Sequence, residues 1–242
     1  MNMSALFRDP AFWAVTLFVV PLLLRVPIAM ALGCASIAVA YFWRLGIDMT
    51  SYNFFASIVK YPLLAIPFFI LAGNIMDKAS IADKIIVFIK ELVGELTGGL
   101  AIAAIGVAVF WGAVSGSTAA TVAAIGVILI PGMVQAGYDK PFATAVVSVA
   151  SGLAIIIPPS ITFILYSVIT GVSVKTIFAA GFLPGFVIAA LLMLSAYITS
   201  RKRGYHGEPR SNGLKGILVA AKDAFWALMT PVVILGGIYG GV

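Results

Sequence analysis

The sequence predicts an all-α polytopic membrane protein, and three observations support that class. Of the 242 residues, 62% are hydrophobic and only 10% are charged, whereas about 25% of the residues in a soluble domain carry a charge. A helix needs about 20 apolar residues to cross a bilayer, and the uncharged stretches 96–138 and 141–174 exceed that length. Most charged residues lie between such stretches, where surface loops are expected.

The formal net charge of +6 fits the same class. Lys and Arg next to apolar spans orient a membrane protein in its lipid bilayer, with the basic loops on the cytoplasmic side. We therefore interpret the charge as a topology signal and expect no nucleic-acid partner. The most basic loop starts with Arg201-Lys202-Arg203 and is predicted to be cytoplasmic. The single cysteine, Cys34, allows no internal disulfide.

Residues 11–43 predict one long helix, bent at Pro21 and Pro27. Arg25 is its only internal charge. We expect this side chain either to pair with a partner or to reach the membrane surface along its aliphatic stem. The apolar run continues to Phe42, which indicates a retained helix rather than a cleaved signal peptide.

Residues 44–53 predict a loop, 54–76 a second span, and 77–97 an amphipathic helix. Apolar residues recur at helical spacing in the third segment, and charged residues interrupt them. Two arrangements are open for this helix. It can lie in the membrane interface with its apolar face toward lipid, or it can be a surface helix packed on a neighbour. The pattern favours the interfacial arrangement.

Residues 98–136 consist of two apolar halves on either side of Ser115-Gly116-Ser117-Thr118. Each half is about long enough to cross a bilayer, and the centre is small and polar but uncharged. One structure with this pattern is a pair of spans joined by a tight turn. The other is a re-entrant hairpin whose tip stays at membrane depth, where non-helical backbone must face protein or a water-filled cavity. The pattern alone leaves both open.

Residues 141–172 predict a helix broken at Pro158-Pro159. In a continuous helix the N–H groups of these two positions would bond the carbonyls of Ala154 and Ile155, but proline has no N–H. A free carbonyl at membrane depth needs another partner. Unwound carbonyls at a broken helix recur as Na⁺ sites in secondary transporters, and water or a side-chain donor is the alternative.

Residues 174–199 predict a full span that ends at the basic loop. A short amphipathic stretch to Trp226 follows the loop, and a last apolar stretch begins near Met229.

The polar residues inside the predicted spans are mostly neutral. All nine carboxylates lie in loops, in the amphipathic segment or at span ends, so the sequence offers no buried carboxylate for a proton relay. Hydroxyl oxygens cluster instead at the centre of 98–136, in Ser115, Ser117, Thr118 and Thr121. Ordinary helix packing through small residues is the alternative explanation for this cluster.

The sequence does not indicate an enzyme. Ser115-Gly116 is similar to the nucleophile region of an intramembrane serine protease, but a serine nucleophile needs a base. The only histidine, His206, lies in the basic loop and is not expected to reach the serine. No phosphate-binding loop, HExxH sequence or dinucleotide motif occurs.

Several stretches resemble the large membrane subunit of the tripartite ATP-independent periplasmic (TRAP) transporters. They cover nearly the whole chain in the family's order, and together they are specific. The similar stretches are "VPIAMALG" at 26–33, "LLAIPFFILAGNIMDKASIADKI" at 63–85, "SGSTAATVAAIGVILIPGMVQAGYDKPFA" at 115–143, "IIIPPSITFILYSVITGVSV" at 155–174, "FAAGFLPG" at 178–185 and "TPVVILGGIYGGV" at 230–242.

The resemblance implies an elevator-type ion-transporter fold with two inverted repeats, of which this chain holds the first. It implies a secondary active transporter for Na⁺-coupled uptake of an organic acid, such as a C4-dicarboxylate, sialic acid or a similar carboxylate. The implied partners are a periplasmic binding protein that delivers the acid, a small four-helix membrane subunit and the C-terminal half of the large subunit. The implied location is the bacterial inner membrane. Because the family's large subunit is longer, we expect this chain to be its N-terminal half, as a fragment or as one piece of a split subunit.

The resemblance also implies roles for individual residues. A helical hairpin in each repeat favours the re-entrant structure for 98–136, with a Na⁺ site between this hairpin and the broken helix. The implied Na⁺ ligands are the side chains of Ser115 and Thr118 and the backbone carbonyls of Ala154, Ile157 and Pro159. Ala154 stands where the family has glycine, and a carbonyl ligand tolerates that change. Ser117 and Ser160 are the implied substrate contacts.

The chain divides into three predicted parts. Residues 1–97 hold scaffold-type transmembrane helices and an interfacial arm helix. Residues 98–172 hold the transport-domain elements, and 173–242 hold a transmembrane helix, the basic cytoplasmic loop and the start of the next repeat. Two other functions stay open: a carboxylate or ion transporter of the same architecture without a binding protein, and a membrane scaffold subunit that does not transport. The segment "GNIMDKASIADK" favours the tripartite family.

Overall fold

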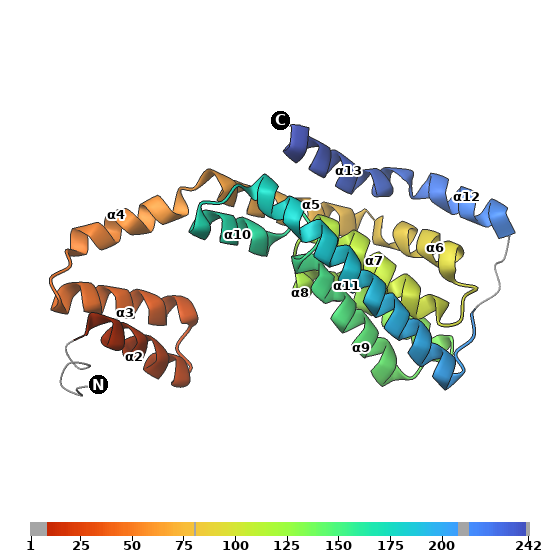
Figure 1. Cartoon of the computed structure of the whole chain (residues 1–242), viewed down its shortest axis with the longest axis horizontal. Coiled ribbons are helices and arrows are strands. Elements are labelled where there is room, and N and C mark those ends of the chain that lie inside the picture. The colour runs from red at the N-terminus through yellow and green to blue at the C-terminus, as the bar shows by residue number, and fades with distance from the viewer. Residues whose placement is uncertain (1–8, 80, 208–212, 241–242) are drawn as a thin grey trace. The chain divides into compact units, whose positions relative to one another are not determined.

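The computed structural model describes residues 9–79, 81–207 and 213–240. Every regular element in these residues is a helix (Figure 1), which confirms the all-α class. The chain forms two compact units, Met1–Lys60 and Tyr61–Val242. Each unit is described by itself.

The first unit contains a helical pair where the sequence predicts one helix. Its described helices are α2 (Pro10–Leu23), α3 (Ile28–Phe42) and α4 (Ile47–Ile58). The prediction of one long helix over 11–43 is wrong, because the chain turns between α2 and α3 and the two helices pack against each other (Figure 1).

A helix-ending turn at Arg25 causes this difference. Arg25 adopts the left-handed backbone conformation (φ 66°), and its N–H bonds the Leu22 carbonyl. The Val26 N–H bonds the Pro21 carbonyl, which completes the Schellman motif that usually has glycine at its left-handed position. Pro27 then caps the start of α3. Arg25 is therefore an exposed residue of the turn between α2 and α3 rather than of a helix interior, and its depth relative to a bilayer stays a prediction.

The predicted loop over 44–53 is also wrong from Ile47 onward. α4 begins at that residue and carries Asp48 in its first turn. A carboxylate there stabilises the helix because it lies near the positive end of the helix dipole. The polar residues that suggested a loop are thus helical.

The second unit is built around α7. Almost every residue of α7 is buried, and the helix contacts α5, α6, α8, α9 and α11. A helix that is apolar on all sides is expected at the centre of a bundle. The described elements of this unit are η1 (Tyr61–Leu64), α5 (Ala65–Lys78), α6 (Ile81–Val93), α7 (Gly99–Ser115), α8 (Thr118–Gln135), α9 (Lys140–Ser151), η2 (Gly152–Ile155), α10 (Ile161–Thr170), α11 (Val174–Arg203), α12 (Gly213–Asp223) and α13 (Phe225–Gly240).

The two helices joined by a tight turn over 98–136 and the interruption of the following helix are confirmed, while a re-entrant course of the first pair stays a prediction. Only Gly116 and Ser117 separate α7 from α8. The segment 141–172 forms α9, the short η2 and α10, and residues 156–160 between η2 and α10 lie outside any helix. The span over 174–199 is confirmed as α11, whose 30 residues extend about 45 Å at a rise of about 1.5 Å per residue.

The amphipathic helix predicted over 77–97 is confirmed over Ile81–Val93 as α6, whereas Asp77 and Lys78 belong to the end of α5. The buried α6 residues Ala82, Ile85 and Ile86 form the face that packs against neighbouring helices, and α6 contacts α7 and α12. This packing agrees with a surface helix on a bundle, while its position relative to a bilayer stays a prediction.

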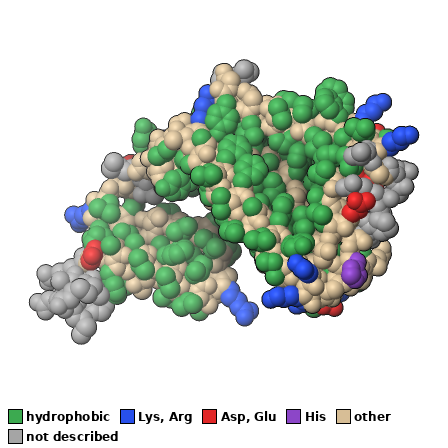
Figure 2. All heavy atoms as spheres, turned by 45° about the vertical axis from the view of Figure 1, so that its right-hand side comes forward, with side chains coloured by type: hydrophobic (Ala, Val, Ile, Leu, Met, Phe, Trp, Pro, Cys, Tyr) green, Lys and Arg blue, Asp and Glu red, His purple; other side chains and the backbone are tan. Residues whose placement is uncertain are grey.

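The described helices are those of a membrane protein. By length and composition α8 and α11 can each cross a bilayer, and the number rises to four if two bent helix pairs each count as one span. Hydrophobic side chains cover most of the face that Figure 2 shows. Leu183 on α11 and Ile169 on α10 are 75% and 83% exposed. Such large exposed apolar surfaces are characteristic of contact with lipid or with another protein.

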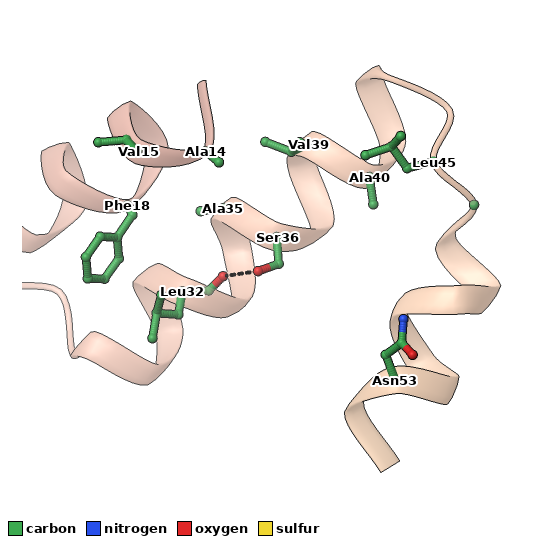
Figure 3. A pocket seen from close by; sticks show the side chains of 11 residues that line it. Ala14, Val15, Phe18, Leu32, Ala35, Ser36, Val39, Ala40, Leu45 and Asn53 are labelled. Carbon is green, nitrogen blue, oxygen red and sulfur yellow. Dashed lines mark hydrogen bonds between the residues drawn. The ribbon is translucent and has the colours of Figure 1, made fainter. Parts of the chain in front are cut away.

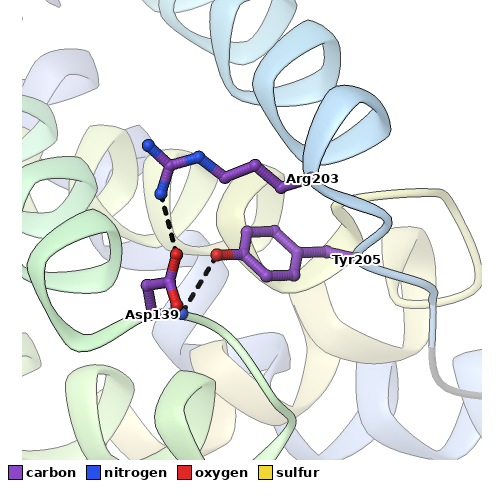
Figure 4. A network of polar contacts seen from close by, with 3 residues as sticks. All are labelled: Asp139, Arg203 and Tyr205. Atoms are coloured by element: carbon purple, nitrogen blue, oxygen red, sulfur yellow. Dashed lines mark hydrogen bonds and ion pairs between the residues drawn. The ribbon is translucent and has the colours of Figure 1, made fainter.

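A polar and aromatic cluster joins the base of the hairpin to the end of α11 (Figure 4). An Arg203 nitrogen lies 3.0 Å from an Asp139 carboxylate oxygen, and the Asp139 N–H donates to the Tyr205 hydroxyl at 3.1 Å. The guanidinium also lies 5.3 Å from the centre of the Phe142 ring, and the Tyr138 and Tyr205 rings are 4.4 Å apart. The turn after α8 and the C-terminal end of α11 therefore lie at the same end of the unit.

This shared end generates a topology prediction. In a Cys34→Ser background, Lys202→Cys and Gln135→Cys should both resist a membrane-impermeant thiol reagent added to intact spheroplasts, because both positions lie at the basic end, which is predicted to be cytoplasmic. Ser173→Cys, at the opposite end of α11, should be labelled. Labelling of Lys202→Cys with protection of Ser173→Cys would reverse the orientation. Opposite results for Lys202→Cys and Gln135→Cys would contradict the shared end.

Candidate ion-binding site at the hairpin tip

The tip of the hairpin turns within two residues. α7 ends at Ser115, and Gly116 follows in the left-handed conformation (φ 60°) with its N–H bonded to the Gly112 carbonyl. Glycine adopts this conformation without a steric penalty. Ser117 is extended and caps α8, where its hydroxyl accepts a hydrogen bond from the Ala120 N–H at 3.5 Å. This polar sequence is therefore, first of all, a turn between two helices.

Two glycines bring the tip into contact with the broken helix. A Cβ atom on Gly116 would lie 2.9 Å from the Pro159 carbonyl oxygen. A Cβ atom on Gly112 would lie 2.7 Å from the Ala154 Cα atom. The Ile161 N–H also donates to the Gly116 carbonyl at 3.3 Å. The structure thus brings the two separate segments that the sequence singled out next to each other.

Thr121 links Ser115 to the backbone of the tip. Its hydroxyl donates to the Ser117 carbonyl at 2.9 Å, and the hydroxyl oxygens of Ser115 and Thr121 are 2.8 Å apart. Because a hydroxyl has one hydrogen, the Ser115 hydroxyl donates in the second bond. It also accepts from the Ser117 N–H at 3.4 Å, which leaves one lone pair for another partner. Sequence reasoning placed Thr121 in the oxygen cluster but not among the ligands. Its spacing of four residues from Ser117 is the signal for this link.

The Thr118 hydroxyl is buried and has no hydrogen-bond partner among the described residues. A buried hydroxyl without a partner costs about 1–3 kcal/mol, and such a group in a folded protein needs an explanation. A water molecule or a cation at this position would supply the partner. Since Thr118 is one of the predicted ligands, its environment fits the predicted ion.

The broken helix has a partner for one of the two carbonyls that the prolines leave free. The Ser160 hydroxyl donates to the Ile155 carbonyl at 2.9 Å. A side-chain donor, the alternative named above, takes that place. Within the described residues no hydrogen bond to the Ala154 carbonyl is found. Ile157 is buried in the same break, with its side chain next to Gly185 of α11.

The two predicted substrate contacts lie in different surroundings. Ser160 is fully buried and caps α10, because its hydroxyl also accepts from the Phe163 N–H at 3.4 Å. Ser117 lines a cavity beside the tip. Contact of either residue with a substrate stays a prediction.

This cavity has a volume of about 500 Å³ and is lined by residues of α5, α7, α8 and α10 together with Ser117. Phe69 and Trp111 belong to its apolar lining, and Ser115, Ser117 and Asn74 provide polar groups. None of its lining residues is ionisable. The sequence analysis did not name Asn74 as a candidate site residue. A neutral amide within an apolar run is the feature that could have indicated it.

The first unit has a cavity of its own, of about 480 Å³, between α2, α3 and α4 (Figure 3). Small and apolar side chains such as Ala35 and Val39 line it, and none of the lining residues is ionisable. The Ser36 hydroxyl already donates to the Leu32 carbonyl at 2.8 Å. The hairpin tip, with its buried unpartnered oxygen, is therefore the stronger candidate site.

The fold and the site define an all-helical membrane protein in which an uncharged helical hairpin contacts a broken helix. Residues 15–242 match the family described as "Tripartite ATP-independent periplasmic transporter, DctM component". The chain belongs to this family of TRAP transporter large permeases, which confirms the resemblance seen in the sequence.

Three relatives illustrate the match. The chain is 44% identical over 226 residues to the "C4-dicarboxylate TRAP transporter large permease protein DctM" of Vibrio cholerae, covering 91% of this chain and 49% of that protein. It is 43% identical over 226 residues to the "Isethionate TRAP transporter permease protein DctMQ" of Oleidesulfovibrio alaskensis, covering 93% and 36%. It is 32% identical over 245 residues to the "Sialic acid TRAP transporter permease protein SiaT" of Haemophilus influenzae, covering 100% and 39%. The chain thus spans half or less of the length of these relatives, which are permeases rather than enzymes.

The contact between tip and broken helix generates a stability prediction. Gly112→Ala would place a methyl group 2.7 Å from the Ala154 Cα atom, and overpacking of this kind costs about 1–3 kcal/mol. We expect its melting temperature in detergent to fall below that of Gly132→Ala. This control adds the same methyl group in α8, where nothing lies within 4 Å. Equal melting temperatures would contradict the close contact.

Proposed function

We propose that this chain supplies the first inverted repeat of an elevator-type TRAP permease that takes up an organic acid together with Na⁺. The observation that carries the proposal is the buried, unpartnered Thr118 hydroxyl at the hairpin tip. The tip contacts the broken helix, whose Ala154 carbonyl also lacks a hydrogen bond among the described residues. Oxygen atoms without partners therefore occur on both sides of one contact.

The Na⁺ ligands in this proposal are neutral oxygens. Ser115 and Thr118 provide hydroxyl oxygens. The Ser115 hydroxyl suits this role because its proton goes to Thr121. One lone pair accepts from the Ser117 N–H, and the other stays available for the ion. Unwound carbonyls of a broken helix are a recurring source of further ligands, and here they come from Ala154, Ile157 and Pro159.

Neutral ligands favour Na⁺ over a proton as the coupling ion. A proton relay needs a titratable group, and none lines the cavity beside the tip. When bound, the ion supplies a positive charge in surroundings of low dielectric constant, where it attracts an anion strongly. Ion and substrate then increase each other's affinity, which is the physical basis of coupling.

The proposed substrate is an organic acid. The names of the relatives specify C4-dicarboxylates, isethionate and sialic acid. In this chain Ser117 lines the cavity and begins α8, whose N-terminal N–H groups favour a carboxylate. We assign the substrate contact to Ser117 ahead of Ser160, because the Ser160 hydroxyl already donates one hydrogen bond and accepts another.

In this proposal, a second repeat and two partner proteins supply the remaining parts of the transporter. A second repeat would supply the other half of the substrate site, since this chain covers 49% of its Vibrio cholerae relative. The hairpin would be re-entrant. Its non-helical tip would be covered by the broken helix, because non-helical backbone at membrane depth must face protein or a water-filled cavity. A small four-helix membrane subunit and a periplasmic binding protein complete the proposed assembly in the bacterial inner membrane.

Uptake measured against Na⁺ concentration tests this proposal. The assay uses proteoliposomes with a full-length large permease that includes this chain, the small subunit and the binding protein. Ser115→Ala and Thr118→Val should each raise the Na⁺ concentration for half-maximal uptake about 10-fold, because a lost contact to a charged partner weakens binding by about this factor.

The control is Ser36→Ala, which removes a hydroxyl bonded to a carbonyl of its own helix in the first unit. It should leave the Na⁺ dependence unchanged. An unchanged Na⁺ dependence in both tip variants would overturn the ion site, and uptake driven by a proton gradient without Na⁺ would overturn the coupling.

A further inference from the structure

α11 contacts the rest of its unit along a narrow stripe of mostly small residues. The helix has 30 residues, but large side chains between the contacts, such as Leu183, are exposed. The contacts recur at intervals of three, four or seven residues, as one line along a helix requires. The buried residues of α11 are Phe178, Gly181, Gly185, Ala189, Ala196 and Ser200.

Two glycines of this stripe contact the broken helix at its interruption. A Cβ atom on Gly181 would overlap the Phe163 ring and lie 2.7 Å from the Ile156 carbonyl oxygen. A Cβ atom on Gly185 would lie 2.7 Å from the Ile157 Cγ1 atom. Ordinary contacts of a Cβ atom are 3.4 Å or longer. A residue larger than glycine therefore fits at position 181 only if Phe163 and Ile156 move, and at position 185 only if the Ile157 side chain moves.

The interruption is thus held from two sides. α7 approaches Ala154 through Gly112, and α11 approaches Ile156 and Ile157. Residues 156–160 lie outside any helix, so a regular hydrogen-bond ladder does not fix the directions of their carbonyls. Packing against α7 and α11 has to fix them instead.

We propose that Gly181 and Gly185 are positioning residues for the ion site at the hairpin tip. By fitting against Ile156 and Ile157, they hold the carbonyls of the broken helix in the arrangement that binds Na⁺. This inference rests on the proposed function, because it gives α11 a part in the same site without contact to the ion. Productive geometry in a binding site is held to within about 0.5 Å, and loss of a supporting residue typically lowers metal affinity about 10- to 100-fold.

The two glycines face different atoms, so the two glycine-to-alanine substitutions are expected to have different effects on the ion site. Gly181→Ala presses on the Phe163 ring and on the Ile156 carbonyl oxygen, and the oxygen cannot move without its whole peptide plane. Gly185→Ala presses on the Ile157 side chain, which can be shortened while its carbonyl is retained. Ile157→Ala should therefore make room for the methyl group that Gly185→Ala adds.

The test measures Na⁺ dependence and maximal rate of uptake in the full-length permease with its binding protein and small subunit. Gly181→Ala should raise the Na⁺ concentration for half-maximal uptake about 10-fold, while the maximal rate per folded permease is kept. Gly185→Ala should raise it less, and addition of Ile157→Ala should restore the original value. Leu183→Ala, between the glycines on the exposed face of α11, should change neither quantity.

Each outcome is decisive. A purely structural role would reduce folded permease and total uptake without a change in Na⁺ dependence, and that result for both glycine variants overturns the inference. If uptake by the unaltered permease is independent of Na⁺, the proposed function fails and the inference with it. If Gly181→Ala does not fold, the Gly185→Ala pair decides. An unchanged Na⁺ dependence, or no restoration by Ile157→Ala, then overturns the inference.

Discussion

The second unit depends on the contact between two interruptions of helical backbone. In a bilayer, backbone groups without helical partners must be satisfied inside the protein, and both the hairpin tip and residues 156–160 lie outside helices. Each covers the other, since the Ile161 N–H bonds the Gly116 carbonyl and Gly112 permits the close approach. No charged side chain lines the cavity beside this contact. This is the chemistry that the proposed Na⁺ site requires.

α11 links the two ends of this unit by different kinds of interaction. Near its N-terminal end, Gly181 and Gly185 fit against the broken helix. At its C-terminal end, Arg203 pairs with Asp139, but the two side chains are 47% and 63% exposed, and exposed pairs contribute no more than about 1 kcal/mol. Close packing of small residues, rather than the ion pair, therefore contributes most to the position of α11 against its neighbours.

Much of the fold could be predicted because it follows from local chemistry. Long uncharged apolar stretches predicted the membrane class, and a small polar centre in 98–136 predicted two apolar helices joined by a turn. Pro158-Pro159 predicted the broken helix, since two missing donors end any helical ladder. The stretches quoted from the sequence predicted the family, which the match over residues 15–242 confirms. The ligand roles of individual residues stay predictions, because apolar stretches and prolines do not show where an ion or a substrate binds.

The sequence by itself determined the membrane class, the hairpin, the interruption of the second helix and the family. Only the tertiary structure decided where α2 ends, because Arg25 occupies a left-handed position that glycine usually marks. It also decided that Ser160 bonds the Ile155 carbonyl and that Gly181 lies against Ile156. The physical reason is that helix periodicity, prolines and charge act through neighbours in the chain, whereas the partner of a freed carbonyl and the closeness of two backbones depend on which segments pack together.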